Sequence, residues 1–349
     1  MIRIVNTILI LLLAFSFISC EEKPDPTPLT LMENVVYILN EGTATFNNSS
    51  LSIYSPDSNR VENNVFEKVN QVPFGDVAQS MVKTDDLIYM VINNSGKIYA
   101  IDSESYEFAG KVTGLTSPRY IAFASNEKAY ISDLYDSVIS VFHPKTFELL
   151  SHIDLGRSSE QMIVKNNYLY VLSWSYDRML TKIDIQSDQI VESLEIGLQP
   201  QSMVEDINGK LWILCDGGYA GNPAGHENPR LVRVDPEQMA IEKSFEFEMS
   251  SYPLSELSIN SEGRQMYFIN YHIFSMDIDD QHLPTEPAIE KGSRNIYSLG
   301  IDPEEGDIYL GDAASYVQQG IVFRYDRYAN LLDSFYVGVN PGYIYFDNL

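Results

Sequence analysis

The side chains that most often carry catalysis or bind metals show no functional pattern in this 349-residue chain. No two histidines stand four residues apart, and no Cys/His spacing typical of a zinc site occurs. The nucleophile elbow, the phosphate-binding loop and the dinucleotide-binding fingerprint are missing from the sequence. We therefore expect no enzyme, no resident cofactor and no metal site, and interpret the histidines as surface or hydrogen-bonding residues. They are His143, His152, His226, His272 and His282.

Two acidic runs and one cysteine have simple structural interpretations. Residues 277–280 (DIDD) and 302–307 (DPEEGD) lack the alternating oxygen ligands of a calcium loop, so they are predicted to be solvated turns. Cys215 ends the apolar segment KLWILC and has no basic neighbour in the sequence that would lower the pKa of its thiol. We expect Cys215 to pack in the core.

Residue types suited to binding are more numerous, because aromatic and amide side chains recur in the segments between apolar runs. Aromatic rings supply contact area and amides supply orientation, a combination that suits a large, flat ligand with amide edges. The amides have an alternative role, which is to satisfy backbone groups. The candidate ligand-binding residues are Gln79, Arg119, Tyr135, Gln161, Trp174, Tyr176, Gln201, Tyr219, Tyr271, Tyr297 and Tyr316.

A repeat explains how such distant residues would meet. An apolar strand with a central aromatic residue occurs seven times, with spacings of 52, 41, 40, 42, 55 and 42 residues. A basic period near 41 is typical of four-stranded propeller blades, and alternating apolar residues with frequent turns predict short antiparallel strands and almost no helix. The repeated aromatic residues are Tyr37, Tyr89, Tyr130, Tyr170, Trp212, Tyr267 and Tyr309.

The end of the sequence predicts a closed ring. Residues 337–346 (VGVNPGYIYF) match the first strand of an internal repeat, as in residues 114–123 (GLTSPRYIAF), whereas the first repeat lacks such a strand. The last strand is therefore predicted to complete the first blade and to leave no open sheet edge. We predict an all-β, seven-bladed propeller of four-stranded antiparallel blades over residues 34–349, with six or eight blades and an open solenoid as alternatives.

Propeller topology places the candidate residues on one face. The loops that lead into the innermost strands and the loops between second and third strands emerge on the same side of the ring. The glutamines Gln79, Gln161 and Gln201 recur at similar places in the first class of loop. The second class is long at residues 41–48, 216–229 and 312–320, and variable loops on a constant scaffold are where binding usually occurs.

The first 33 residues carry export signals. Residues 8–18 form an apolar run broken only by Ser16, and the run is too short for a membrane-spanning helix. Ser19 before Cys20 resembles the cleavage site of bacterial lipoproteins, and Glu21 with Glu22 resembles the surface-export tag of Bacteroidetes lipoproteins. We predict a signal peptide over 1–19, lipidation at Cys20 and a proline-rich tether over 20–33. An ordinary secretory signal with an incidental cysteine is the alternative.

Net charge excludes one class of partner. The chain carries 23 basic and 49 acidic residues, a formal charge of −26. Nucleic acids and anionic surfaces require clusters of Lys and Arg, and the sequence has no such cluster. We therefore expect no nucleic-acid partner, and membrane attachment only through the lipid.

Several segments resemble the YncE-like propellers of Bacteroides surface lipoproteins, among them the BtuG-like proteins that capture vitamin B12. The similar segments include VYILNEG at 36–42, GDVAQSM at 75–81, SPRYIAF at 117–123 and SSEQMIV at 158–164. The resemblance implies a lipid-anchored protein on the outer-membrane surface that binds cobalamin or other corrinoids and hands them to a TonB-dependent transporter. A glycan- or protein-binding propeller is the second hypothesis, and a propeller lactonase or lyase is the third.

Overall fold

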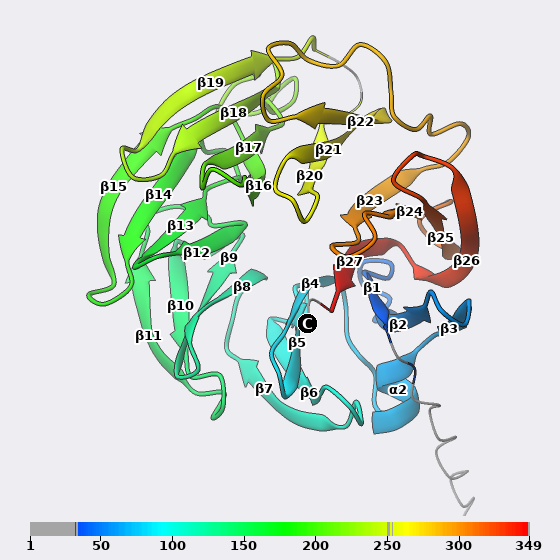
Figure 1. Cartoon of the computed structure of the whole chain (residues 1–349). Coiled ribbons are helices and arrows are strands. Elements are labelled where there is room, and N and C mark those ends of the chain that lie inside the picture. Colours follow the sequence, from blue (N-terminus) through cyan, green and yellow to red (C-terminus); the bar gives the residue numbers. More distant parts are fainter. Residues whose placement is uncertain (1–31, 33, 250–251, 253, 348–349) are drawn as a thin grey trace, which may run out of the picture.

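The alternating strands of the sequence assemble into seven antiparallel sheets around one axis (Figure 1). The computed structural model describes residues 32, 34–249, 252 and 254–347. The predicted signal peptide, Cys20 and nearly all of the tether lie outside the described residues. The prediction of an all-β, seven-bladed propeller is confirmed. No helix in the described part of the chain has the length and apolarity to cross a membrane.

The first four blades are formed by the described residues up to 195 together with the C-terminal strand β27. Blade 1 consists of β27 (Pro341–Phe346), β1 (Val36–Asn40), β2 (Ser50–Ser55) and β3 (Arg60–Glu62). Blade 2 consists of β4 (Ala78–Lys83), β5 (Leu87–Ile92), β6 (Lys97–Asp102) and β7 (Phe108–Thr113). Blade 3 consists of β8 (Pro118–Ser125), β9 (Lys128–Asp133), β10 (Val138–Phe142) and β11 (Leu149–Asp154). Blade 4 consists of β12 (Met162–Lys165), β13 (Tyr168–Leu172), β14 (Met179–Asp184) and β15 (Gln189–Glu195).

The last three blades follow in the same order, from the axis outward. Blade 5 consists of β16 (Pro200–Glu205), β17 (Leu211–Cys215), β18 (Arg230–Asp235) and β19 (Ala240–Glu246). Blade 6 consists of β20 (Ser255–Ile259), β21 (Gln265–Asn270) and β22 (His272–Asp277). Blade 7 consists of β23 (Ile296–Ile301), β24 (Ile308–Asp312), β25 (Gln319–Tyr325) and β26 (Leu331–Val339).

Blade 6 departs from the four-stranded pattern. Its sheet has three strands in the described residues, and the outer place is taken by a segment that touches β22 through one isolated bridge, Ile273 to Ile289. Pro284 and Pro287 precede that bridge. Proline has no N–H to donate to a ladder, so this segment cannot extend its pairing toward them.

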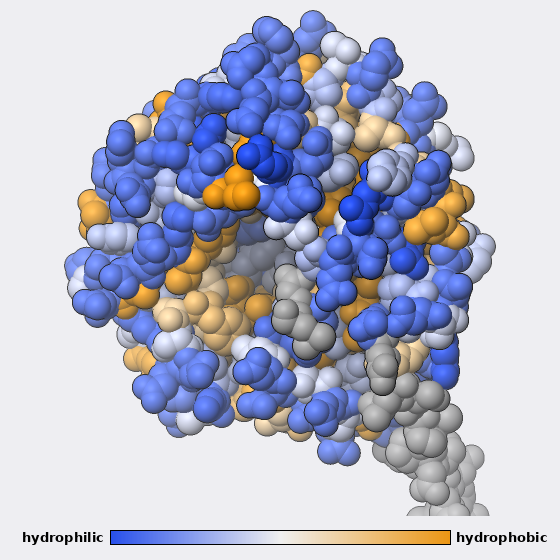
Figure 2. All heavy atoms as spheres, viewed as in Figure 1, coloured by the Kyte–Doolittle hydropathy of each residue, from blue (hydrophilic) through white to orange (hydrophobic). Residues whose placement is uncertain are grey.

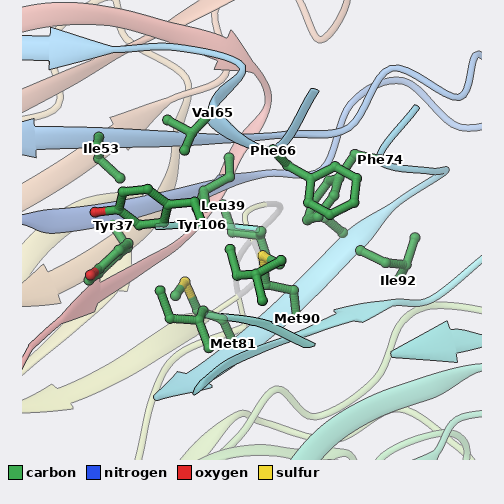
Figure 3. Packing of buried hydrophobic residues seen from close by; sticks show 14 of the residues in the cluster. Tyr37, Leu39, Ile53, Val65, Phe66, Phe74, Met81, Met90, Ile92 and Tyr106 are labelled. Atoms are coloured by element: carbon green, nitrogen blue, oxygen red, sulfur yellow. The ribbon is translucent and has the colours of Figure 1, made fainter. Parts of the chain in front are cut away.

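A short helix accounts for the long first repeat. Helix α2 (Val65–Asn70) lies in the connection between blades 1 and 2 and adds the residues by which the first spacing exceeds the basic period. Its Phe66 ring is 4.9 Å from that of Phe74 and stacks on Tyr99 at 5.1 Å. Figure 3 shows Phe66 and Phe74 with core residues of both blades, including Tyr37 and Met81. The helix therefore extends the hydrophobic core between two blades.

The repeated aromatic residue of each second strand is buried, and in blades 2, 3 and 4 its hydroxyl bonds the outer turn of the next blade. The Tyr89 hydroxyl donates to the carbonyl oxygen of Pro144 at 3.2 Å, in the outer turn of blade 3. Tyr170 donates in the same way to Pro236 in blade 5 at 2.8 Å. Tyr130 makes the corresponding contact with the outer turn of blade 4. The sequence repeat thus encodes contacts between blades as well as strands within them.

Ring closure occurs as the sequence predicts. Strand β27 pairs antiparallel with β1, with Tyr37 opposite Tyr345 and Ile38 opposite Ile344. Lys83 of blade 2 forms an ion pair with Asp347 just after β27. The C-terminal strand therefore completes blade 1 and also contacts blade 2.

We predict that truncation after Val339, which removes β27 and keeps β26 intact, lowers the melting temperature by about 5 °C or more, because it exposes the apolar inner edge of β1. In a domain of this size that shift corresponds to about 3 kcal/mol or more. Circular dichroism during heating measures the effect. Deletion of residues 20–30, which precede the propeller, is the matched control and should leave the melting temperature unchanged. Equal melting temperatures for the two truncations would contradict closure by β27.

Candidate functional site

The innermost strands share a β-bulge that turns one extra residue toward the axis. In β4, Ala78 pairs with Ile92 and Ser80 pairs with Val91, so the residue between them has no partner of its own. Bulges redirect side chains and are common beside functional sites. Within the described residues, six of the seven inner strands contain such a register shift. The residues at these shifts are Gln79, Arg119, Gln201, Glu256, Tyr297 and Gly342.

Blade 4 supplies Glu160 at the equivalent place, not the predicted Gln161. Glu160 N–H donates to Leu172 at 2.8 Å and Gln161 accepts from the same residue at 3.1 Å, so two residues oppose one. Glu160 stands two residues before Met162, as Gln79 and Gln201 stand two residues before their methionines. The sequence interpretation aligned Gln161 one residue too late, because Gln161 directly precedes Met162 and was matched to the other glutamines by residue type and not by spacing.

Two of the predicted glutamines bond backbone groups of the next blade. The Gln161 Oε1 atom accepts from the N–H of Met203 at 2.5 Å. Gln201 Nε2 donates to the carbonyl oxygen of Leu254 at 2.8 Å. Gln161 and Gln201 therefore satisfy backbone groups, which was the alternative role considered for these amides. Both side chains also line the cavity described below.

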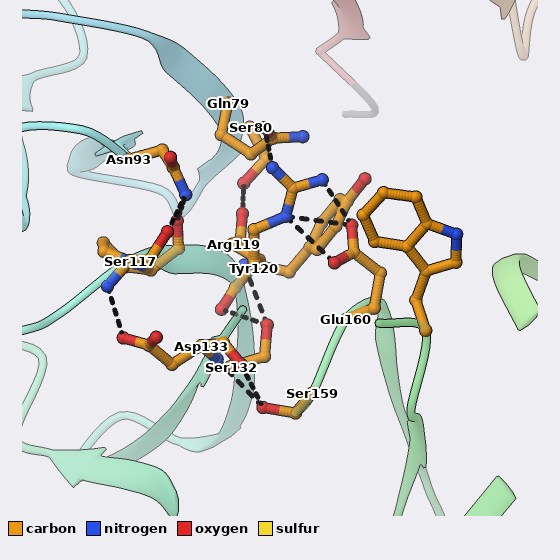
Figure 4. A network of polar contacts seen from close by, with 12 residues as sticks. Gln79, Ser80, Asn93, Ser117, Arg119, Tyr120, Ser132, Asp133, Ser159 and Glu160 are labelled. Atoms are coloured by element: carbon orange, nitrogen blue, oxygen red, sulfur yellow. Dashed lines mark hydrogen bonds and ion pairs between the residues drawn. The ribbon is translucent and has the colours of Figure 1, made fainter. Parts of the chain in front are cut away.

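Arg119 and Glu160 form the most strongly bonded contact beside the axis (Figure 4). Arg119 Nε and Nη2 donate to both Glu160 oxygens at 2.7 to 3.0 Å, and Nη1 donates to Gln79 Oε1. The side chains of Arg119 and Glu160 are 15% and 3% exposed. Burial alone would lower the pKa of the Arg119 guanidinium, but the Glu160 carboxylate outweighs burial and raises that pKa. The pair is a fixed, neutral unit spanning blades 2 to 4.

The inner strands surround a cavity of about 920 Å³. Figure 2 shows a hollow at the centre of the ring, with hydrophobic residues (orange) in its wall and a mostly hydrophilic surface around it. The bulge residues and the long loops line the polar end of the cavity. The far ends of the inner strands make an apolar wall from Val204, Ile259, Ile301, Ile344 and Phe346.

Aromatic side chains from the loops between second and third strands surround the polar end. Trp174 Nε1 donates to Asp216 Oδ2 at 2.8 Å, which fixes the plane of the indole. Burial raises the pKa of the Asp216 carboxyl. Tyr271 packs on Tyr252 with ring centroids 4.3 Å apart, and Tyr316 lies edge-on to its neighbour in blade 7.

The backbone at this rim is strained. Tyr176, Tyr271 and Tyr316 have φ values of 58°, 63° and 64° in equivalent loops of blades 4, 6 and 7. Left-handed backbone is uncommon for bulky residues and costs on the order of 1–3 kcal/mol. Such strain concentrates where a side-chain direction matters for function.

Eight of the eleven predicted site residues line the cavity. Three do not: Tyr135, Tyr176 and Tyr219 are 75%, 52% and 51% exposed and lie outside the lining. The hydroxyls of Tyr176 and Tyr219 are 3.4 Å apart, so these two residues contact each other. The eight in the lining are Gln79, Arg119, Gln161, Trp174, Gln201, Tyr271, Tyr297 and Tyr316.

The site contains carboxylates that the sequence interpretation did not select. Glu41, Glu160 and Glu256 all line the cavity. Burial and then Glu41 raise the pKa of Glu256 to about 8, and burial also raises the pKa of Glu41 against the hydrogen bond from Tyr297. Alignment of inner strands two residues before each buried apolar position would have found Glu160, whereas Glu41 follows a second strand and has no such signal.

The structure places the remaining candidate side chains in structural roles. Cys215 is fully buried, and burial raises the pKa of its thiol, as expected for a packing residue. His272 Nδ1 accepts from the N–H of Lys291 at 3.2 Å. No group of three or more His, Cys, Asp or Glu side chains among the described residues is arranged to hold a metal ion.

Residues 34–340, nearly the whole propeller, match a family described as a domain of unknown function, DUF5074. The chain belongs to the DUF5074 family. No curated protein matches its sequence. The expected propeller family is confirmed at the level of the fold, whereas the finer likeness to YncE-like and BtuG-like proteins stays a prediction.

Solved structures similar to this DUF5074 propeller differ widely from it in sequence. A quinonprotein alcohol dehydrogenase-like protein from Bacteroides thetaiotaomicron has a TM-score of 0.70 at 13% identity, over 90% of this chain and 78% of that one. A protein from Lactobacillus plantarum has a TM-score of 0.65 at 14% identity, over 91% and 100%. Hydrazine synthase from Kuenenia stuttgartiensis has a TM-score of 0.54 at 14% identity, over 70% and 78%. At such identities the likeness shows the fold alone.

We predict that Glu160→Gln destabilises the DUF5074 propeller by about 3 kcal/mol, because it leaves the buried Arg119 charge without its partner. Urea unfolding measures the change. The matched control is Glu62→Gln, which removes a surface carboxylate paired with the 43%-exposed side chain of Arg60 and should cost less than about 1 kcal/mol. Equal losses for both variants would show that the Arg119–Glu160 pair is no more important than a surface pair.

Proposed function

We propose that this DUF5074 propeller is a capture protein that binds cobalamin or a related corrinoid at the polar end of its cavity. The observation that carries the proposal is a preformed cavity of about 920 Å³ whose wall combines amide, aromatic and carboxylate side chains on rigid inner strands. Volumes of this order suit a sizeable organic ligand. A corrinoid macrocycle is larger, so it would lie partly outside and leave a surface for a transporter.

The rim supports binding of a flat ring. Trp174, Tyr271 and Tyr316 lie at the cavity and present aromatic surface. The Asp216 hydrogen bond and the left-handed backbone hold these rings before any ligand arrives. Preorganised groups lose little conformational entropy on binding, which favours high affinity without any chemical step.

A glycan is the second candidate ligand. Trp174 and Tyr271 line the cavity together with Gln79 and Glu256, and aromatic rings in a wall that also holds amides and carboxylates suit sugar rings and their hydroxyls. The same titration experiment therefore includes a glycan panel.

We predict that cyanocobalamin binds with a heat and a spectral change, and that Trp174→Ala weakens its affinity about tenfold or more, because a buried aromatic contact is worth over 1 kcal/mol. Isothermal titration calorimetry measures the heat and the affinity, and absorption spectroscopy measures the spectral change. Tyr135→Ala is the matched control, since this exposed tyrosine lies outside the cavity, and it should bind normally. No heat at micromolar protein would exclude the corrinoid, and heat only with a glycan would favour the second candidate.

The proposed location is the outer-membrane surface, through lipid on Cys20. Strand β1 runs from Val36 to Asn40, and the next residue, Glu41, lines the cavity. The chain therefore enters the propeller at the face opposite the polar end. A tether before residue 34 would direct the binding end away from the membrane, toward ligand and transporter.

We predict that Cys20→Ala moves the protein from the membrane fraction to the soluble fraction, because the lipid would be its membrane anchor. Cys215→Ala removes the other cysteine and should leave the protein in the membrane fraction. Immunoblots of fractionated cells, with protease added to intact cells, provide the measurement. A wild-type protein that resists protease until the cells are lysed would contradict surface display.

A further inference from the structure

The bulge positions form a ring of seven places, one from each blade, at the polar end of the cavity. Six places carry side chains, and the seventh is Gly342 of blade 1. A Cβ atom added at Gly342 would lie 2.6 Å from Glu41 Oε1 and 2.7 Å from Glu41 Cγ. The Glu41 side chain therefore occupies the space that a residue at the seventh place would fill. Glu41 reaches it from the end of the neighbouring strand β1.

The ring is electrically uneven. On one side, Arg119 and Glu160 neutralise each other, and Gln79 is uncharged. On the other side, blades 6, 7 and 1 contribute Glu256, Tyr297 and Glu41 in succession. The Tyr297 hydroxyl donates a hydrogen bond to Glu41 Oε2 at 2.9 Å. Neither Glu41 nor Glu256 forms a salt bridge with any described residue.

The two basic side chains that line the cavity, Arg119 and Lys291, already have hydrogen-bond partners in the protein. Arg119 uses three of its nitrogens on Glu160 and Gln79. The Lys291 ammonium donates to the carbonyl oxygen of Arg294 at 2.8 Å and lies 4.8 Å from the centroid of the Tyr271 ring. An incoming carboxylate would meet two acidic side chains on one side and, on the other, a guanidinium whose charge is already neutralised by Glu160.

We propose that Glu41 and Glu256 set the charge specificity of the cavity, accepting hydrogen bonds from amide or ammonium N–H groups of the ligand and rejecting carboxylates. This inference rests on the proposed function and deepens it: among corrinoids, those with amide side chains bind and those with free carboxylates do not. Like charges brought together in a partly dehydrated site repel strongly, and discrimination of this kind needs no additional contact.

The specificity depends on pH in a defined direction. Because burial and Glu41 raise the pKa of Glu256 to about 8, this carboxyl is mostly protonated at neutral pH and becomes anionic above it. The groups that face it are Glu41, Tyr120, Tyr297 and Tyr343. Burial raises the pKa of each of these tyrosines, so they stay neutral over this range. Rejection of an anionic ligand therefore strengthens as the pH rises through the pKa of Glu256.

Calorimetric titration of the full propeller with two corrinoids tests the inference. Cobinamide carries peripheral amides, and cobyrinic acid carries carboxylates at the same places. We predict that wild-type protein binds cobinamide roughly tenfold or more tightly than cobyrinic acid, and that this ratio is larger at about pH 9 than at about pH 6. Glu41→Gln should reduce the ratio, and Glu256→Gln should reduce it at about pH 9, where the wild-type Glu256 carboxyl is anionic, with Glu62→Gln as the matched control.

A second variant, Gly342→Ala, moves a carboxylate without removing its charge. Gly342→Ala keeps both carboxylates but displaces Glu41 from the ring, so it should also reduce the ratio and move the pH dependence of Glu256 to lower pH, because Glu41 helps to raise the pKa of Glu256. Equal binding of the two corrinoids by wild-type protein, or a ratio that Glu41→Gln and Glu256→Gln leave unchanged, would overturn the inference while leaving corrinoid capture intact. Binding of neither corrinoid would overturn the proposed function, and this inference with it.

Discussion

The burial of each second strand between two neighbouring blades is the constraint on which the rest of the structure depends. All residues of β1 and β17 are buried, although each belongs to a four-stranded sheet at a different place in the ring. A strand buried on both faces needs a neighbour on both sides, so the array is stable only when closed. The repeated aromatic residues meet the same need, because Tyr89 and Tyr170 bond the outer turn of the following blade.

Closure leaves the inner strands free to serve the cavity. Their pairing with the second strands holds the backbone, and side chains such as Ser80 and Ser298 donate at 2.6 Å to a carbonyl of the next blade. The bulge then adds one residue that lines the cavity, and in blades 3, 4 and 5 its side chain also bonds a neighbouring blade. Sites built on rigid strands hold their geometry better than sites on loops alone. Scaffold and site thus use adjacent residues of the same strand without competing.

The sequence predicts the scaffold well because the scaffold is periodic. Seven aromatic strands indicated seven blades, and the match of residues 337–346 to an inner strand indicated closure. The site was predicted in part, since topology selects a face but not a distance from the axis. Tyr135 lies on a suitable loop and is nevertheless 75% exposed outside the cavity. Glu160 was missed because the glutamine after it was matched by residue type and not by spacing, whereas the bulge puts Glu160 at the equivalent place. Glu41 was missed because it follows β1 and fills the place beside Gly342 of β27.

The ring of bulge residues also explains how a repetitive fold can recognise an irregular ligand. Seven identical residues would give a channel with sevenfold symmetry and no preferred orientation for a bound molecule. Here equivalent places carry an amide, a guanidinium, a carboxylate, a phenol and a glycine, with the neutral Arg119–Glu160 pair across the ring from Glu256 and Glu41, which form no salt bridge with a described residue. Because strand pairing inside each blade does not depend on these side chains, places whose side chains make no contact between blades can change without loss of the fold, whereas Gln201 and the Arg119–Glu160 pair do make such contacts. Propellers only 13 to 14% identical can therefore share this architecture.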